Sequence, residues 1–262
     1  MSGKTKIHST ACVHPNAVLA NDVEVGPYSI IGENASIGSQ TKIGNGCLID
    51  GQTRIGKRCH IFSGAVLGSI PQDLKYNGEN TELIIGDDNI IREYVTINLG
   101  TADHKKTLIG NKNLFMAYAH VAHDCVIGDG NVIANVGTFA GHVTVEDKVV
   151  VGGMTAVHQF VRLGKISIIG GCSKVVQDIP PFSMVDGHPA KIFGINKVGL
   201  NRADVSSESI IRLKNAFRIL FKEKLSMTNA IKKVEEEISA DEHVQYLLNF
   251  IKSSQRGVSG GS

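Results

Sequence analysis

The 262-residue chain has no tryptophan, few other aromatic residues and only six prolines. Neither sign of charge dominates, because 27 lysines and arginines stand against 25 aspartates and glutamates, so the overall charge does not indicate a nucleic-acid-binding protein. No apolar run reaches the roughly 18 residues of a membrane span, and the first residues lack the apolar core of a signal peptide. We therefore expect a cytoplasmic protein with no membrane span and no nucleic-acid partner.

In place of large rings, the sequence has a repeat with a period of six residues. Stepping by six from Ile7 to Val175 visits 29 positions, and 26 of them hold Ile, Val, Leu or Phe. A chain that is 42% apolar would fill about 12 of them by chance. Six is not a helical period, so a short strand followed by a turn, repeated many times, predicts a parallel β-solenoid with these residues inside.

Small residues occupy two other positions of the repeat. Glycine follows the inward residue in 12 of the 29 cases, which predicts either positive φ or a close approach of the backbone there. The fifth position is mostly small and includes three of the five cysteines, Cys47, Cys59 and Cys125, which we interpret as compact filler. An odd number of cysteines without Cys-x-x-Cys spacing argues against a disulfide framework or a zinc–cysteine cluster.

The repeat resembles the hexapeptide-repeat family, whose fold is an all-β left-handed parallel β-helix with three hexapeptides in each triangular coil of 18 residues. We assign residues 1–190 to this solenoid, with two ejected loops at 69–82 and 102–107 that keep the phase of the repeat. Residues 191–262 are expected to form an α-helical C-terminal region. From about Ser206 the apolar residues recur with helical spacing, and residues 257–262 are predicted to be a disordered tail.

Four of the ten histidines gather on three successive coils if residues i and i+18 stack. The columns are His123–Gly141–Gln159, Asp124–His142–Phe160 and Ala122–Ala140–His158. A neutral imidazole suits general-base catalysis at neutral pH. An adjacent carboxylate could orient it, and the N–H of Gly141 could bind an oxyanion. This set predicts acyl transfer to a hydroxyl without a covalent enzyme intermediate.

Two alternatives to catalysis by this cluster remain open. The histidines could form a hydrogen-bonded ladder along one corner, with no chemistry. A zinc site is the other alternative, because related solenoids form a carbonic anhydrase with three histidine ligands. His120 and His123 with His142 or His158 could provide such a site.

Longer strings in the chain resemble the acyl-[acyl-carrier-protein]–UDP-N-acetylglucosamine O-acyltransferases, which begin lipid A biosynthesis. The matching strings are residues 71–76, 120–125, 140–143, 152–160 and 177–181. The resemblance implies transfer of a (3R)-hydroxyacyl group from acyl carrier protein to the 3-hydroxyl of UDP-N-acetylglucosamine by a homotrimer. It implies no metal and no cofactor apart from the phosphopantetheine of the carrier protein.

The resemblance also implies a role for each matching residue. His123 would be the general base, Asp124 its orienting partner and Gly141 the oxyanion donor. The nucleotide sugar, the phosphopantetheine arm and the acyl chain would be held by a larger substrate-binding set: Asp73, Leu74, Lys75, His120, His142 and Gln159 for the sugar nucleotide, His158 for the arm, Asn196 and Arg202 for the donor or diphosphate, and Gly171 as the acyl ruler. Without a side chain, Gly171 should admit a longer acyl group.

The chain departs from the family pattern at a few positions. Asn98 and Leu99 stand where the best-known members have His-Arg, and Asn98 could still hydrogen-bond the substrate. Val198 and Ala203 replace a common glutamate and an arginine. Some relatives use a 3-amino sugar, so the acceptor could be a hydroxyl or an amine. A basic helix face could dock the acidic carrier protein; its residues are Arg212, Lys214, Arg218, Lys222 and Lys224.

Overall fold

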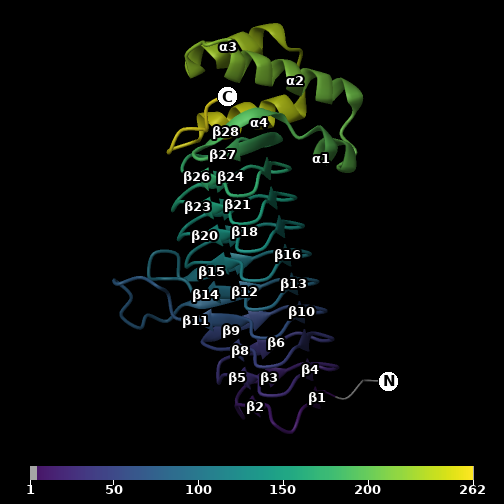
Figure 1. Cartoon of the computed structure of the whole chain (residues 1–262), viewed down its shortest axis with the longest axis vertical. Helices are drawn as coiled ribbons and strands as arrows, with labels where there is room; N and C mark the ends of the chain where they lie inside the picture. The colour runs from purple at the N-terminus through teal and green to yellow at the C-terminus, as the bar shows by residue number, and fades with distance from the viewer. Residues whose placement is uncertain (1–4, 262) are drawn as a thin grey trace.

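The computed structural model describes residues 5–261 as an elongated stack of coils with helices at one end (Figure 1). Most strands have only two residues, and each turns into the next at a corner. Residues 1–4 and Ser262, which lie in the segments predicted as the start of the solenoid and the end of the tail, are outside the described residues.

Strands from successive coils line up in three sheets. The first contains β1 (Lys6–Ile7), β4 (Glu24–Val25), β7 (Lys42–Ile43), β10 (His60–Ile61), β13 (Ile90–Ile91), β16 (Leu114–Phe115), β19 (Val132–Ile133), β22 (Val150–Val151), β25 (Ile168–Ile169), β27 (Ser183–Gly187) and β28 (Ala190–Ile195). The second contains β2 (Cys12–Val13), β5 (Ile30–Ile31), β8 (Leu48–Ile49), β11 (Val66–Ser69), β14 (Thr96–Asn98), β17 (His120–Val121), β20 (Thr138–Phe139), β23 (Ala156–Val157) and β26 (Lys174–Val175). The third contains β3 (Val18–Leu19), β6 (Ser36–Ile37), β9 (Gln52–Ile55), β12 (Glu82–Ile85), β15 (Lys106–Ile109), β18 (Val126–Ile127), β21 (Thr144–Val145) and β24 (Arg162–Leu163).

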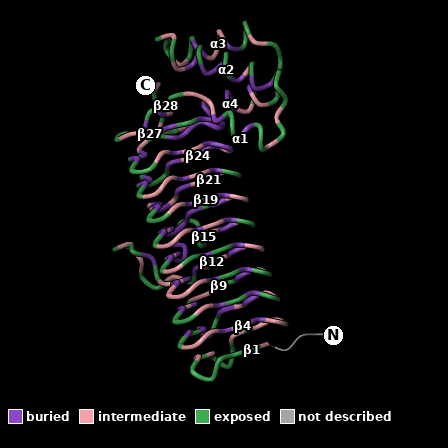
Figure 2. Tube along the Cα trace, turned by 45° about the vertical axis from the view of Figure 1, so that its right-hand side comes forward, coloured by how far each residue is buried: buried purple, intermediate pink, exposed green. Residues whose placement is uncertain are grey.

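The strands within the stack are parallel, and most are offset by 18 residues, as in the pairing of Val121 with Phe139. Every apolar residue of the six-residue series from Val25 to Val175 is at most 4% exposed, and buried stretches recur along the coils above the first (Figure 2). The inward assignment is therefore confirmed. Ile7 is 48% exposed because it belongs to the first coil, which has no coil beneath it. Burial of each aliphatic side chain contributes about 1.5–3 kcal/mol to the stability of the folded state.

The glycines of the repeat are required for space and not for positive φ. Of the 12 that follow an inward residue, only Gly68 has positive φ. A Cβ at Gly110 would lie 2.6 Å from the carbonyl oxygen of Gly128 on the next coil. The close backbone approach is confirmed, whereas the alternative of positive φ is wrong for all but one. Most non-glycine residues three positions before the inward residue adopt the left-handed conformation, among them Asp124, His142 and Phe160.

Both interruptions of the repeat form loops, and both leave the stack at the corner between the second and third sheets. The first joins β11 to β12 as residues 70–81, and the second joins β14 to β15 as residues 99–105. The second begins three residues earlier than predicted, and Lys106 and Thr107 belong to β15. In Figure 1 these segments project sideways from the middle of the stack.

The helical region covers the C-terminal end of the stack (Figure 1). It contains α1 (Lys197–Arg202), α2 (Ser207–Lys222), α3 (Met227–Glu237) and α4 (Glu242–Lys252). The side chains of Ser206, Ser226 and Asp241 accept backbone N–H groups at the starts of α2, α3 and α4. The predicted boundary at residue 190 falls at the start of β28, which pairs antiparallel with β27, so the sheet continues to Ile195.

The predicted disorder of the tail is wrong for residues 257–261. Asp178 donates its N–H to the carbonyl of Gly257, and Ile192 donates to the carbonyl of Gly260, so the tail pairs with the last coil and with β28. These bonds satisfy backbone groups at the end of the stack, where no further coil follows. Of the helices between residues 5 and 261, none has the length and apolar character to span a bilayer.

All five cysteines are free. Cys47, Cys59 and Cys125 are buried, as expected for filler, and burial raises the pKa of the Cys125 thiol to about 12. A thiol that stays protonated at neutral pH acts as a small apolar group.

Candidate active site

The clustered histidines lie where the chain passes from the second sheet to the third, the same corner from which the two loops leave. His123 and Asp124 follow β17, and Gly141 and His142 follow β20 one coil further on. The N–H of His142 donates to the carbonyl of His123 at 3.0 Å, so these turns stack with the expected offset. The predicted columns of the corner are therefore confirmed.

His123 and Asp124 form a buried hydrogen-bonded pair. The distance from Nδ1 of His123 to Oδ2 of Asp124 is 2.8 Å, and their side chains are 7% and 0% exposed. Burial opposes ionisation of Asp124, but hydrogen bonds from Thr101 and His123 outweigh it and hold the pKa of this carboxyl below its ordinary value. An ionised carboxylate can only accept, so Nδ1 of His123 carries the proton and Nε2 is the basic nitrogen.

Gly141 lies directly against the His123 ring. A Cβ at Gly141 would be 2.4 Å from Cε1 of His123, so any side chain would displace the imidazole. Within residues 5–261 the N–H of Gly141 makes no hydrogen bond. The corner therefore combines a base with a backbone donor that is available for a developing oxyanion.

His142 is enclosed by rings and carboxylates. Its ring stacks on Phe160 with centroids 4.5 Å apart and meets the rings of His123 and His104 edge-on. Its Nε2 lies 3.7 Å from Oδ2 of Asp124 and 3.9 Å from Oδ2 of Asp103. Burial lowers the pKa of His142 although both carboxylates oppose the shift, so the ring is neutral at pH 7.

His120 points outward from β17 beside His123. Its Nδ1 is 2.7 Å from the hydroxyl oxygen of Thr96 on the preceding coil. Burial, and secondly the charge of His123, lower the pKa of His120. Both His120 and His142 are therefore suited to hydrogen-bonding a neutral or anionic ligand as uncharged rings.

Two of the potential metal ligands of the corner, His123 and Asp124, are already hydrogen-bonded to each other, whereas Nδ1 of His142 has no partner among the described residues. His123, Asp124 and His142 place ligand atoms within 4.8 Å of one another. The two carboxylate oxygens of Asp124 accept three hydrogen bonds, from Thr101 and His123. His158, a member of the predicted alternative zinc set, instead contacts Arg256. The donor set therefore fits an oriented base better than a zinc site.

The first loop brings further predicted residues to the same corner. Asp73 and Lys75 lie on it, and the side chain of Leu74 is completely exposed. Asn98 is 3% exposed and donates from Nδ2 to the carbonyls of Ser69 and Ile70, which fixes the stem of the loop. Its expected contact with substrate stays a prediction.

Other predicted residues lie at different corners of the same chain. Gly171 follows β25, at the corner between the first and second sheets. Asn196 caps α1 and donates to the carbonyl of Ile166 at the third corner, and Arg202 ends α1. His158 and Gln159, in contrast, lie at the histidine corner on the coil above Gly141. One chain therefore does not gather the complete predicted set.

Sequence reasoning missed several residues that contact the cluster. Thr101 and Thr107 bond Asp124, and His104 lies against His142. Arg256 reaches from the tail to Nδ1 of His158 at 3.3 Å and to the carbonyl of Val176. The two threonines flank or begin an ejected loop, and this position is the one signal in the sequence that could have indicated them. The sequence carries no such signal for His104 or Arg256.

Comparison with known proteins gives consistent matches over nearly the whole chain. Residues 178–259 match the family described as UDP N-acetylglucosamine O-acyltransferase, domain 2, and residues 4–39 and 106–136 match the bacterial transferase hexapeptide. The acyl-[acyl-carrier-protein]–UDP-N-acetylglucosamine O-acyltransferase of Thiobacillus denitrificans is 52% identical over 96% of this chain and 98% of that protein. The same enzyme of Aliarcobacter butzleri is 49% identical over 96% of this chain and 97% of its own.

The chain belongs to the acyl-[acyl-carrier-protein]–UDP-N-acetylglucosamine O-acyltransferase family. The solved structure of LpxA from Acinetobacter baumannii agrees, with 42% identity and a TM-score of 0.93 over 97% of this chain and 99% of that one. Helical region and solenoid are thus shared with family members as one unit.

Proposed function

We propose that the protein transfers a (3R)-hydroxyacyl group from acyl carrier protein to the 3-hydroxyl of UDP-N-acetylglucosamine, the first step of lipid A biosynthesis. The observation that carries this proposal is the His123–Asp124 pair, in which Nδ1 of His123 lies 2.8 Å from Oδ2 of Asp124. On the coil above, the N–H of Gly141 has no hydrogen-bond partner among the described residues. Family membership supports the choice of donor and acceptor.

The proposed reaction is a direct attack on the thioester. Nε2 of His123 accepts the proton of the sugar 3-hydroxyl as its oxygen bonds to the thioester carbonyl carbon. The N–H of Gly141 stabilises the resulting oxyanion, and Asp124 stabilises the imidazolium. Collapse breaks the carbon–sulfur bond, and the imidazolium returns the proton to the leaving phosphopantetheine thiolate. A positioned general base accelerates such reactions by about 10²–10⁴.

Two proposed substrate contacts extend the site along the corner. His120 and His142, whose pKa values are lowered mainly by burial, are neutral hydrogen-bonding partners for the sugar nucleotide. His158 and Gln159 lie one coil above Gly141 and are exposed, which supports a contact with the donor's phosphopantetheine arm. No cofactor is required beyond that arm.

We propose a homotrimer because the site needs residues from other corners. The corner between the first and second sheets carries a ridge of exposed apolar side chains, which are Tyr28, Tyr94, Tyr118, Val136 and Met154. An apolar ridge of this kind is typical of an interface. Placed against the histidine corner of the next protomer, it would bring Gly171 to the acyl chain. Sedimentation should give three times the 28.0 kDa mass of the chain, and a monomer would contradict the trimer.

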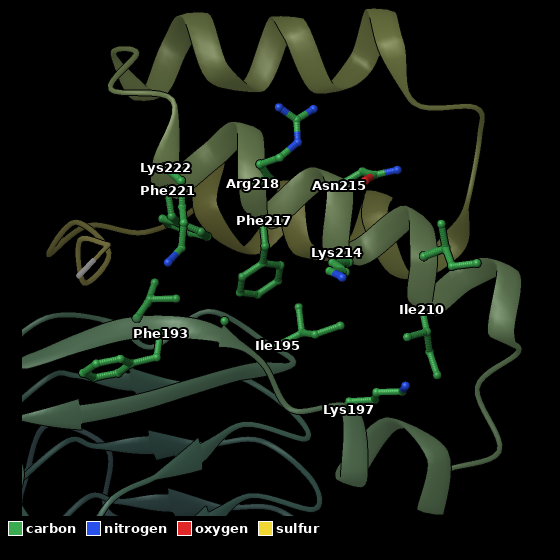
Figure 3. Close-up of a pocket in the computed structure, with 13 residues that line it drawn as sticks. Phe193, Ile195, Lys197, Ile210, Lys214, Asn215, Phe217, Arg218, Phe221 and Lys222 are labelled. Atoms are coloured by element: carbon green, nitrogen blue, oxygen red, sulfur yellow. The ribbon is translucent and has the colours of Figure 1, made fainter.

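The basic face of α2 supports docking of an acidic carrier protein, but fewer of its cations are free than predicted. Arg212 pairs with Asp241, and Arg218 pairs with Glu223. A cavity of about 500 Å³ between β28 and α2 has Phe217 and Lys214 facing into it, whereas Arg218 points away from β28 (Figure 3). We expect Lys214→Glu with Lys222→Glu to raise the KM for the carrier protein, less so at high salt, and to leave the KM for the sugar nucleotide unchanged.

Three further features are proposed on the family resemblance. The coils wind left-handed, although parallel β-crossovers are generally right-handed. The location is cytoplasmic, in keeping with five free thiols. The acceptor is a hydroxyl, with a 3-amino sugar as the alternative because some relatives use one.

The decisive experiment incubates the protein with UDP-N-acetylglucosamine and a series of (3R)-hydroxyacyl carrier proteins and identifies products by mass spectrometry. An O-acylated sugar nucleotide is expected. Product from a 3-amino UDP-sugar alone would support the alternative acceptor, and no product from either would overturn the proposal. Dialysis against a chelator should leave the rate unchanged; a loss restored by zinc would support the metalloenzyme alternative.

A further inference from the structure

The second ejected loop is tied at both ends to Asp124. Thr101, at the start of the loop, donates its N–H to Oδ1 at 2.9 Å and its hydroxyl to Oδ2 at 2.6 Å. Thr107, just after the loop, accepts the N–H of Asp124 at 2.9 Å. Thr101 is 8% exposed and Thr107 is fully buried. Thr101 on the loop and Thr107 just after it therefore hold both the carboxylate and the backbone of this one residue.

These hydrogen bonds fix the orientation of the carboxylate that faces His123. Oδ2 accepts from the Thr101 hydroxyl and from Nδ1 of His123, while Oδ1 accepts from the Thr101 N–H. Two donors from one residue set both the rotation and the tilt of the carboxylate plane. Thr107 holds the backbone of Asp124 at a φ of 59°. This left-handed conformation is less unfavourable for aspartate than for most other residues.

We propose that Thr101 is a positioning residue for the acyl transfer, acting through Asp124 on the basicity and orientation of His123. This inference rests on the proposed function, in which His123 is the base. Thr107 assists by holding the backbone of the same aspartate. The ejected loop is in this view part of the catalytic corner, although none of its residues is required to touch substrate.

The direction of the effect follows from the hydrogen bonds. Removing the Thr101 hydroxyl leaves the Asp124 carboxylate less stabilised, so it holds the imidazolium of His123 more strongly and the ring loses its proton at higher pH. The other titratable groups facing the pair are His120, His142, His104 and Asp103, and none of them is substituted in any variant. A shift in the acid limb of the rate profile therefore reports on Thr101.

Kinetics of two substitutions test this role. Thr101→Val should lower kcat about tenfold, as expected for a lost hydrogen bond to a charged group, with little change in either KM, and should move the acid limb of kcat to higher pH. Thr101→Ser keeps both donors and should stay within about twofold of wild type. Thr41→Val is the control, since Thr41 is a fully buried threonine bonded to the carbonyl of Gly56, away from this corner.

The outcomes separate this inference from the proposed function. If the wild type is active and Thr101→Val matches it in kcat and pH profile, the positioning role is overturned while the proposed function stands. If the wild type forms no product, the proposed function fails. NMR titration of the His123 ring then decides, because an unchanged ring pKa in Thr101→Val overturns the inference and a raised one supports it. Thr101→Ala gives the same comparison if Thr101→Val does not fold.

Discussion

Two corners of the same prism have nearly the same backbone and different contents. At the corner between the second and third sheets, the left-handed position of successive coils holds Asp124, His142 and Phe160. At the corner between the first and second sheets, it holds Tyr118, Val136 and Met154, all exposed. Both corners repeat every 18 residues, so the backbone alone does not select the site.

The comparison shows how a solenoid separates stability from chemistry. Inward positions of every coil must be apolar, because each one packs on the coil above and below. Outward corner positions carry no such requirement, so one corner can collect polar, titratable residues and another can present an apolar ridge. The loops leave only at the histidine corner, which adds donors such as Thr101 to what the repeat provides.

The largest effect is expected from a substitution in the apolar core of the solenoid, on which all three corners depend. Ile133 on β19 is fully buried, and Ile133→Asp places an unpaired charge in the stack. We expect a loss of more than about 4 kcal/mol of stability or no folded protein. Val126→Asp on the outward face of β18, where the side chain is 37% exposed, should retain a cooperative thermal transition. Equal melting curves for both variants would contradict the inward assignment.

The next largest effect is expected from removing the proposed base, which leaves the apolar core intact. His123→Ala should lower kcat by about 10²–10⁴, with circular dichroism and melting temperature close to wild type. Lys148→Ala is the control, because Lys148 is exposed and lies in a turn at the third corner, away from the histidines. A His123→Ala enzyme that keeps wild-type kcat would show that the histidine corner is structural.

A smaller effect sharpens the role of the apolar corner. A Cβ at Gly171 would lie 3.2 Å from the carbonyl oxygen of Gly153, so a side chain fits with a small adjustment and points outward. If this corner contacts the acyl chain in the trimer, Gly171→Met should shift the preferred donor to a shorter chain. A panel of hydroxyacyl carrier proteins of different lengths measures this shift. Identical selectivity in both proteins would remove Gly171 from the acyl site.

The smallest effect concerns the dependence of stability on pH. Hydrogen bonds hold the pKa of Asp124 below its ordinary value in the folded protein despite burial. The ionised carboxylate therefore contributes stability above the pKa of the unfolded chain, and that contribution is lost as pH falls through the folded-state pKa. The difference in unfolding free energy between wild type and Asp124→Asn, measured in urea, should narrow from pH 6 to pH 3. A constant difference would contradict the role of these hydrogen bonds.

Much of the fold and part of the site could be predicted from the sequence. The six-residue period identified the inward residues, and the 18-residue offset placed His123 under Gly141. Positive φ was assigned to the wrong residues because close approach and left-handed backbone both favour glycine in a sequence. The pairing of Arg212 could not be recognised, because its partner Asp241 lies 29 residues further on, at the start of α4. The partner of Arg218, Glu223, lies only five residues away, at the end of the same helix.

The sequence by itself determined the buried core of the solenoid. Because the coils stack at a constant offset, each coil needs apolar inward residues at the same spacing. Tertiary structure alone decided what the loops and the tail do. Thr101 reaches Asp124 across 23 residues, and Arg256 reaches His158 across 98. Neither separation is a multiple of the coil, because both contacts are made by chain that has left the regular stack and returned to it.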